Sequence, residues 1–251
     1  IDALTAEFRR LGFQTTEPTE LMTQTPDGGA QPIGQKSAHI MFADTYIELT
    51  AVETNDPGHH LSQFLLNQKY GLRLIILRTD NIDLSCDIAR AARLQPSLKQ
   101  TATRNIFYGG GGRAMFKWVS LSSLEFSDAL VGFVEHQTPE IVFQEQMARH
   151  PNGCSGFAHL IYGGKTLPDA YFALAATRGI DVICDETAKN ANHFIGAVFQ
   201  TNNINTIPIL LRENGVSFAF KGDGVEIQLM EAPFFIRFEP VGDSTDEMIV
   251  A

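Results

Sequence analysis

One unit, a helix followed by several strands, recurs along this chain of 251 residues. The helix patterns cover residues 1–13, 81–94 and 166–180. Each begins near an aspartate suited to helix capping, and these aspartates, Asp2, Asp83 and Asp169, lie 81 and 86 residues apart. Apolar strands at 71–79 and 156–164 precede the second and third helices. Self-similarity at so regular an interval predicts a fold assembled from copies of one small module.

Each unit also ends in an apolar strand with a glutamate at its centre. The strands are YIELTA with Glu48, FVEHQT with Glu135 and VEIQLM with Glu226, so the glutamates lie 87 and 91 residues apart. Two of these strands close matching hairpins, IMFADTYIEL and FAFKGDGVEI, whose turns contain Asp44 and Asp223. A repeated β-α-β-β-β module is the simplest description of the pattern.

Glu48 interrupts a strand that is otherwise suited to burial, and burying an unpaired carboxylate is costly. Side chains alternate along a strand, so Tyr46, Glu48 and Thr50 share one face and Ile47 lies on the other. We expect the first face to form the floor of a cavity. Because Glu135 repeats the position of Glu48, we expect both carboxylates to converge in one hollow, with a positive group between them.

Two linkers divide the repeat. Residues 55–63 join the first two units, and 146–156, which contain a Pro-Asn-Gly turn, separate this pair from the rest. We predict paired modules over 1–145, whose first strand would precede Ile1, and a degenerate third or fourth module over 153–251. The helix pattern at 204–216 could start a compressed fourth unit, so both one long module and two short ones remain open there.

Composition restricts the partners of the chain. It is 44% hydrophobic, which is enough for a sizeable core. A net charge of −10 without a dense Lys/Arg run argues against nucleic acid or an anionic membrane as partner. No apolar stretch approaches the roughly 20 residues that span a bilayer. The three cysteines, Cys86, Cys154 and Cys184, predict reduced thiols in a cytoplasmic protein.

Six short motifs follow one another along the chain: RRLGF (9–13), FADTYIEL (42–49), GLRLIILRTDNID (71–83), FKWVSL (116–121), FVEHQTPE (133–140) and HPNG (150–153). Their order and spacing resemble the bacterial glyoxalase-like domain family. This family is part of the vicinal oxygen chelate superfamily of glyoxalases, extradiol dioxygenases and bleomycin-resistance proteins. The resemblance implies an α+β fold in which βαβββ modules form cupped mixed sheets around a divalent ion, and it also allows a homodimer.

The resemblance places metal ligands on the first and last strands of each module. Glu48 and Glu135 occupy last-strand positions, while a first-strand histidine would precede Ile1. The first strand of module two, 71–79, offers no histidine or carboxylate, which departs from the glyoxalase I pattern. A Zn, Mn, Ni or Fe ion held there would act as a Lewis acid on two adjacent substrate oxygens, with a ligand glutamate as base. The favoured function is therefore a metal-assisted lyase or isomerase acting on a small oxygen-rich metabolite.

Two other functions remain open. A metal-free binding protein of the bleomycin-resistance type would sequester a ligand by shape and aromatic stacking, and the lack of a ligand on 71–79 favours it. An extradiol-type iron dioxygenase would use His159 and His193, but the strand expected to supply its carboxylate carries Arg237.

Several further side chains are candidates for contact with metal or substrate. His159 is a candidate metal ligand, and the candidate substrate contacts are Tyr46, His39, Arg113, Trp118 and His150. Ordinary core or turn roles are the alternative for each of them. His59 and His60 indicate a solvated loop. The glycines of FYGGGGRAMFKW (107–118) predict a hairpin turn and not a phosphate loop, because no GK[ST] and helix follow them.

Overall fold

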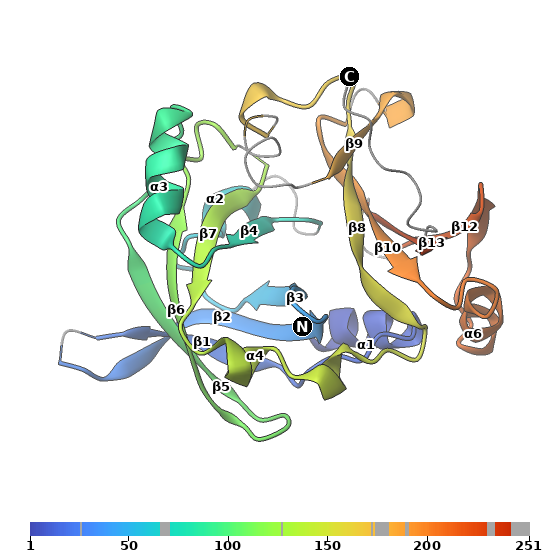
Figure 1. The fold of residues 1–251 in the computed structure, drawn as a ribbon, viewed down its shortest axis with the longest axis horizontal. Helices are drawn as coiled ribbons and strands as arrows, with labels where there is room; N and C mark the ends of the chain where they lie inside the picture. The colour runs from blue at the N-terminus through green and yellow to red at the C-terminus, as the bar shows by residue number, and fades with distance from the viewer. Residues whose placement is uncertain are drawn as a thin grey trace.

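The computed structural model describes residues 1–25, 27–65, 71–126, 128–171, 173, 181–188, 191–229 and 234–241. Within them the strands form two curled mixed sheets with few helices, as Figure 1 shows, so the predicted α+β architecture of cupped sheets is confirmed. One sheet has seven strands in the order β3-β2-β1-β5-β6-β7-β4, and the other has six in the order β11-β12-β13-β10-β8-β9.

The first sheet and its helices come from the N-terminal part of the chain. The strands are β1 (Thr19–Gln24), β2 (Ala30–Met41), β3 (Tyr46–Val52), β4 (Leu74–Arg78), β5 (Gln100–Ile106), β6 (Gly112–Ser120) and β7 (Leu130–His136). The helices are α1 (Asp2–Arg10), α2 (Ser62–Leu65), α3 (Ile82–Ala91), α4 (Pro139–Val142) and the 3-10 turn η1 (Glu145–Ala148).

The second sheet follows η1 along the chain. Its elements are β8 (Cys154–Gly163), β9 (Val182–Asp185), the 3-10 turn η2 (Glu186–Ala188), β10 (His193–Thr201), α6 (Ile207–Glu213), β11 (Ala219–Lys221), β12 (Gly224–Gln228) and β13 (Phe235–Pro240). The helix expected at 166–180 lies mostly outside the described residues. No helix in the described part of the chain is long and apolar enough to cross a membrane.

The predicted module occurs twice in complete form. The two complete modules are β4-α3-β5-β6-β7 and β10-α6-β11-β12-β13. Across the sheet, the first strand of each module lies next to the fourth, followed by the third and the second, and the first and fourth strands are parallel. The segment α1-β1-β2-β3 repeats the last four elements of this pattern. Glu226 lies on β12, the third strand of its module, so the expectation that it marks a last strand is wrong. The short hairpin β11–β12 resembles β2–β3 in sequence, but here one more strand, β13, follows it.

Local chemistry explains the boundaries of α3 and of the β5–β6 hairpin. The side chain of Asn81 caps α3 by accepting a hydrogen bond from the backbone of Leu84 at 3.0 Å, so Asn81 and not Asp83 is the N-cap. The four-glycine segment turns the chain between β5 and β6, as predicted. Gly109 and Gly111 have φ values of 56° and 63° there, which is the left-handed region that glycine adopts at little cost.

An aromatic cluster around His150 joins the two sheets. The His150 ring lies 5.5 Å from Phe13 and 5.1 Å from Phe42, and Phe13 also contacts Phe199 of β10 and Phe238 of β13. His150 Nε2 pairs with the carbonyl of Met41 at 2.9 Å, and Nδ1 accepts from the backbone N–H of Gln14 at 3.1 Å. The structure therefore places His150 in the core between the sheets, and not over the cup as a substrate contact.

His150→Ala should lower the free energy of unfolding by about 2–4 kcal/mol, because it leaves two buried backbone groups unpaired and opens a cavity among aromatic rings. Urea denaturation measures this change. The neighbouring exposed variant Arg149→Ala serves as control and should shift stability by less than about 0.5 kcal/mol. Equal effects of the two variants would contradict this role of His150.

Candidate functional site

A cavity of about 500 Å³ lies inside the curve of the first sheet. Every strand of that sheet contributes to its lining, and β8 of the second sheet contributes Phe157 and Leu160. It reaches the surface at the exposed residues Asp44, Thr45 and Arg78. Residues from both faces of the edge strands β3 and β4 line it, so the cavity continues between these two edges towards β8.

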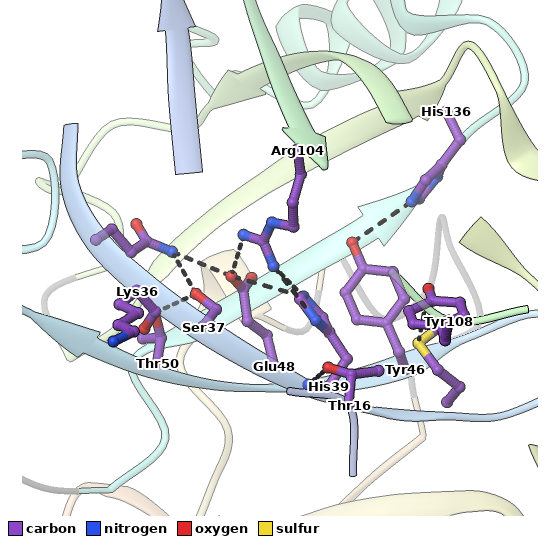
Figure 2. Close-up of polar contacts among 12 residues, drawn as sticks. Thr16, Lys36, Ser37, His39, Tyr46, Glu48, Thr50, Arg104, Tyr108 and His136 are labelled. Atoms are coloured by element: carbon purple, nitrogen blue, oxygen red, sulfur yellow. Dashed lines mark hydrogen bonds and ion pairs between the residues drawn. The ribbon is translucent and has the colours of Figure 1, made fainter. Parts of the chain in front are cut away.

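The floor of the cavity carries a buried ion pair. Arg104 of β5 donates from Nη2 to Oε1 of Glu48 on β3 at 3.0 Å and from Nη1 to Nε2 of His39 on β2, as Figure 2 shows. Gln35 Nε2 donates to the same Glu48 oxygen at 3.1 Å. Arg104 is only 4% exposed. The positive group that compensates Glu48 is therefore an arginine of this chain.

The curl of the sheet makes this contact possible. Strands β5 and β3 are three strand spacings apart, which is about 14 Å in a flat sheet. Glu48 and His39 are direct partners across β2 and β3, so they share one face and one level. Sequence reasoning missed Arg104 because its partner comes from another module. The signal present in the sequence was that Arg104 is the only charged residue of the segment Gln100–Ile106.

Burial and the ion pair set the protonation states on the floor. Burial raises the pKa of Glu48, but the charge of Arg104, together with His39 and the hydrogen bonds from Ser37 and Arg104, outweighs burial and holds the pKa at about 2. Burial, aided by Arg104, lowers the pKa of His39 to about 3. His39 is therefore neutral at pH 7 and accepts the hydrogen bond from Arg104, although its Nε2 lies 3.9 Å from the Glu48 carboxylate.

Aromatic and imidazole rings form the walls next to this floor. Tyr46 Oη lies 3.4 Å from Nε2 of His136, and the His136 ring packs against Phe116 and Phe143. Burial lowers the pKa of His136 to about 4 and raises the pKa of Tyr46, so both are neutral at pH 7. Of the predicted substrate contacts, Tyr46, His39 and Trp118 thus line the cavity.

His60 was expected in a solvated loop, but its ring lies 5.4 Å from Trp118 and lines the cavity. The His59 ring stacks on it at 4.3 Å, and His59 is buried. Burial lowers the pKa of His60 to about 4. The helix α2 that follows folds this loop back onto the sheet, which a reading of the polar segment alone does not reveal.

The structure does not bring Glu48 and Glu135 together. On β7, Val134 and His136 face the cavity, so Glu135 lies on the opposite face of the sheet. Its Oε2 accepts a hydrogen bond at 3.0 Å from the backbone N–H of Ile82, at the start of α3, and Lys117 Nζ lies 3.7 Å from Oε1. The expectation of one shared hollow is wrong, because a shift of one residue reverses the face of a strand residue.

The remaining candidates lie elsewhere. Arg113 is exposed beside the β5–β6 turn, donates to Thr103 Oγ1 at 3.3 Å and is not part of the cavity lining. His159 pairs with Val198 across β8 and β10, five positions along β10 from His193, which is about 16 Å. The structure therefore does not assemble these two histidines into an iron site.

The fold of the two sheets is that of the vicinal oxygen chelate superfamily. The family model described as "Glyoxalase-like domain" matches residues 1–178 of the chain. The chain therefore belongs to the glyoxalase-like domain family. No curated protein matches the sequence.

Two solved structures share the fold at low identity. One is a xylose isomerase-like TIM barrel/4-hydroxyphenylpyruvate dioxygenase fusion protein, with 12% identity and a TM-score of 0.60 over 98% of this chain. This chain spans 47% of that fusion protein. The other is a mutant of 4-hydroxymandelate synthase from Streptomyces coelicolor, with 11% identity and a TM-score of 0.59, covering 97% of this chain and 91% of that one. At these identities the likeness shows the fold alone.

Members of this superfamily commonly hold a divalent ion in the cup, but the residues that line the cavity of the first sheet do not fit a divalent ion. The guanidinium of Arg104 already lies between His39 and Glu48, where an ion shared by these two side chains would have to be. Among the described residues, no three His, Cys, Asp or Glu side chains gather into a possible metal site. The cationic group on this floor is a side chain.

Arg104→Met should destabilise the protein by about 3–5 kcal/mol, because it leaves Glu48 buried without a cation. The double variant Arg104→Met/Glu48→Met should recover most of this loss, as replacing both partners by apolar groups removes the uncompensated charge. Urea denaturation of the single and double variants measures the coupling, with the exposed Arg113→Met as control. Additive effects of the two substitutions would contradict the pairing.

The buried histidines predict acid-sensitive stability. Because their pKa values are lower in the folded state than the ordinary 6.5, the unfolded chain binds more protons at acid pH. Stability should be constant above about pH 6.5 and fall progressively towards pH 4. Urea midpoints from pH 8 to pH 4.5 test this, and His136→Phe should flatten the dependence. A midpoint that rises on acidification would contradict it.

Proposed function

We propose that the cavity of the first sheet binds a small, largely apolar organic molecule without a metal ion, so that the protein acts as a binding or sequestration module. The observation that carries this proposal is the position of Arg104, which takes the place between Glu48 and His39 that a catalytic ion would need. A cavity of about 500 Å³ with aromatic and aliphatic walls has the size and character of sites for small organic ligands.

The protonation states on the floor also favour binding over acid–base catalysis. A general base works best with a pKa near the operating pH. Arg104 keeps the pKa of Glu48 at about 2, and the cavity histidines have pKa values of about 3 to 4. These groups would be weak proton acceptors at pH 7. The lyase or isomerase function, which needs Glu48 as ligand and base, is therefore less well supported than the binding function.

The two structural neighbours offer only an analogy. Their names contain aromatic hydroxy acids, and an aromatic ligand would suit a cavity walled by Trp118, Phe116 and Tyr46. An iron-dependent reaction is not proposed, because His159 on β8 lies opposite Val198, five positions along β10 from His193, and because Arg237 is paired with Glu226 at 2.6 Å.

The uncharged fluorescent probe N-phenyl-1-naphthylamine tests the proposed function. In buffer containing EDTA, its fluorescence should rise saturably, with one site per chain and an affinity in the micromolar range. Ala158→Trp, which places a large ring in the lining on β8, should weaken binding at least about tenfold.

The control for this experiment is Ala219→Trp, which adds the same ring at an exposed position on β11. It should leave the affinity unchanged. Equal loss of binding in both variants, or no saturable binding to the unmodified protein, would contradict the proposal.

A further inference from the structure

We propose that the ligand of this cavity is electrically neutral and carries an amide-like head group, which donates one hydrogen bond to Gln35 and accepts one from Arg104. This inference rests on the proposed binding function and specifies the chemical class of the ligand. Two independent features of the cavity floor support this inference: the charge balance of its side chains and their unpaired polar atoms.

The charge balance argues against a charged head group. Arg104 and Glu48 neutralise each other at 3.0 Å, and the neighbouring His39, His60 and His136 are neutral because burial lowers their pKa values. An anionic ligand would bring a second negative charge next to Glu48, and a cationic one would face Arg104. Burying either charge without its own partner is unfavourable.

Charged groups at the mouth do not change this conclusion. Arg78, Asp44 and Asp181 border the cavity at exposed positions, where water and salt weaken their influence on a buried head group. Arg78 is also engaged with the chain itself, donating to the carbonyl of Asp44 at 3.3 Å and lying 4.9 Å from the centre of the Phe143 ring.

Three buried polar atoms of the cavity side chains have no hydrogen-bond partner among the described residues: Gln35 Oε1, Arg104 Nε and His136 Nδ1. The orientation of the Gln35 amide follows from its neighbours, since Nε2 donates to the Glu48 carboxylate, which can only accept. Oε1 is therefore a free acceptor. Buried polar groups in native proteins are almost always paired, so these atoms point to a bound polar group.

The unpaired atoms of Gln35 and Arg104 specify two hydrogen bonds that a ligand could make. Gln35 and Arg104 both donate to Oε1 of Glu48, so their polar ends meet at one place on the floor. Gln35 offers an acceptor there and Arg104 Nε offers a donor. A carboxamide or lactam supplies the complementary N–H and C=O within one small neutral group. A carboxylate has no donor for Gln35, and an ammonium has no acceptor for Arg104.

The apolar part of the ligand would then extend along the walls. Trp118 and Phe116 of β6 and Leu74 and Ile76 of β4 also line the cavity. This arrangement suits a flat ring or short hydrocarbon skeleton attached to the amide.

Three matched probes test the inference: naphthalene-2-carboxamide, 2-naphthoate and naphthalen-2-ylmethylamine, each competing with N-phenyl-1-naphthylamine at pH 7.5. The amide should displace the fluorescent probe at a concentration at least about tenfold lower than either charged analogue. Gln35→Met, which removes the free acceptor, should reduce this preference to less than about twofold. The exposed variant Gln100→Met should retain it.

Each result has a defined meaning. Retained affinity of Gln35→Met for N-phenyl-1-naphthylamine verifies that the variant is folded with an intact cavity. Displacement by the carboxylate or amine at concentrations equal to or lower than the amide overturns the inference while the binding function stands. Failure of all four compounds to bind the unmodified protein overturns the binding function and this inference together.

Discussion

The ion pair between Arg104 and Glu48 is the interaction on which the cup of this protein depends. It joins β5 to β3 across the curve of a sheet, and it keeps a carboxylate ionised at a buried position. Without a cation, the free energy of burying Glu48 would favour protonation or exposure of its side chain. The pair therefore links two distant strands of the curved sheet and sets the charge of the cavity floor. His39 completes the pair by accepting a hydrogen bond from the guanidinium, and Gln35 completes it by donating one to the carboxylate.

The repeat was accessible from the sequence, since hairpin turns and apolar strands are local features. The module β4-α3-β5-β6-β7 and the motifs of the family follow from such signals, whereas the sequence left open how residues 153–251 divide into modules. The face of the sheet on which each glutamate lies was harder to predict from the sequence. Glu48 and Glu135 occupy similar places in similar strands, but β7 directs Val134 and His136 inward, so Glu135 lies on the other side and accepts a hydrogen bond from the backbone of Ile82. Because side chains alternate between the two faces of a strand, an alignment error of one residue places a side chain on the wrong face of the sheet.

Long-range partners were the least accessible part of the site. Arg104 is separated from Glu48 by 56 residues, and nothing in either strand indicates that they meet. His150 shows the same limit in another way, because both of its nitrogens bond to backbone groups of distant segments. Its place in the sequence, before a Pro-Asn-Gly turn, left a substrate contact or a turn role as the two predictions. Such contacts depend on how modules pack, which the sequence of one module does not contain.

The same fold can thus support different chemistry with a small change on its floor. In this chain the floor of the cavity carries a neutral ion pair, and aromatic side chains line the walls. Among the described residues, a guanidinium lies between the two side chains best suited to bind an ion.

Equilibrium dialysis of the purified protein against Zn, Mn, Ni or Fe(II), followed by elemental analysis, tests the central claim most directly. If Arg104 is the cation of the floor, metal content should stay substoichiometric and should not differ between the unmodified protein and Glu48→Gln. One ion per chain that disappears in Glu48→Gln would contradict the account, because it would show that a metal ion and not Arg104 compensates this carboxylate.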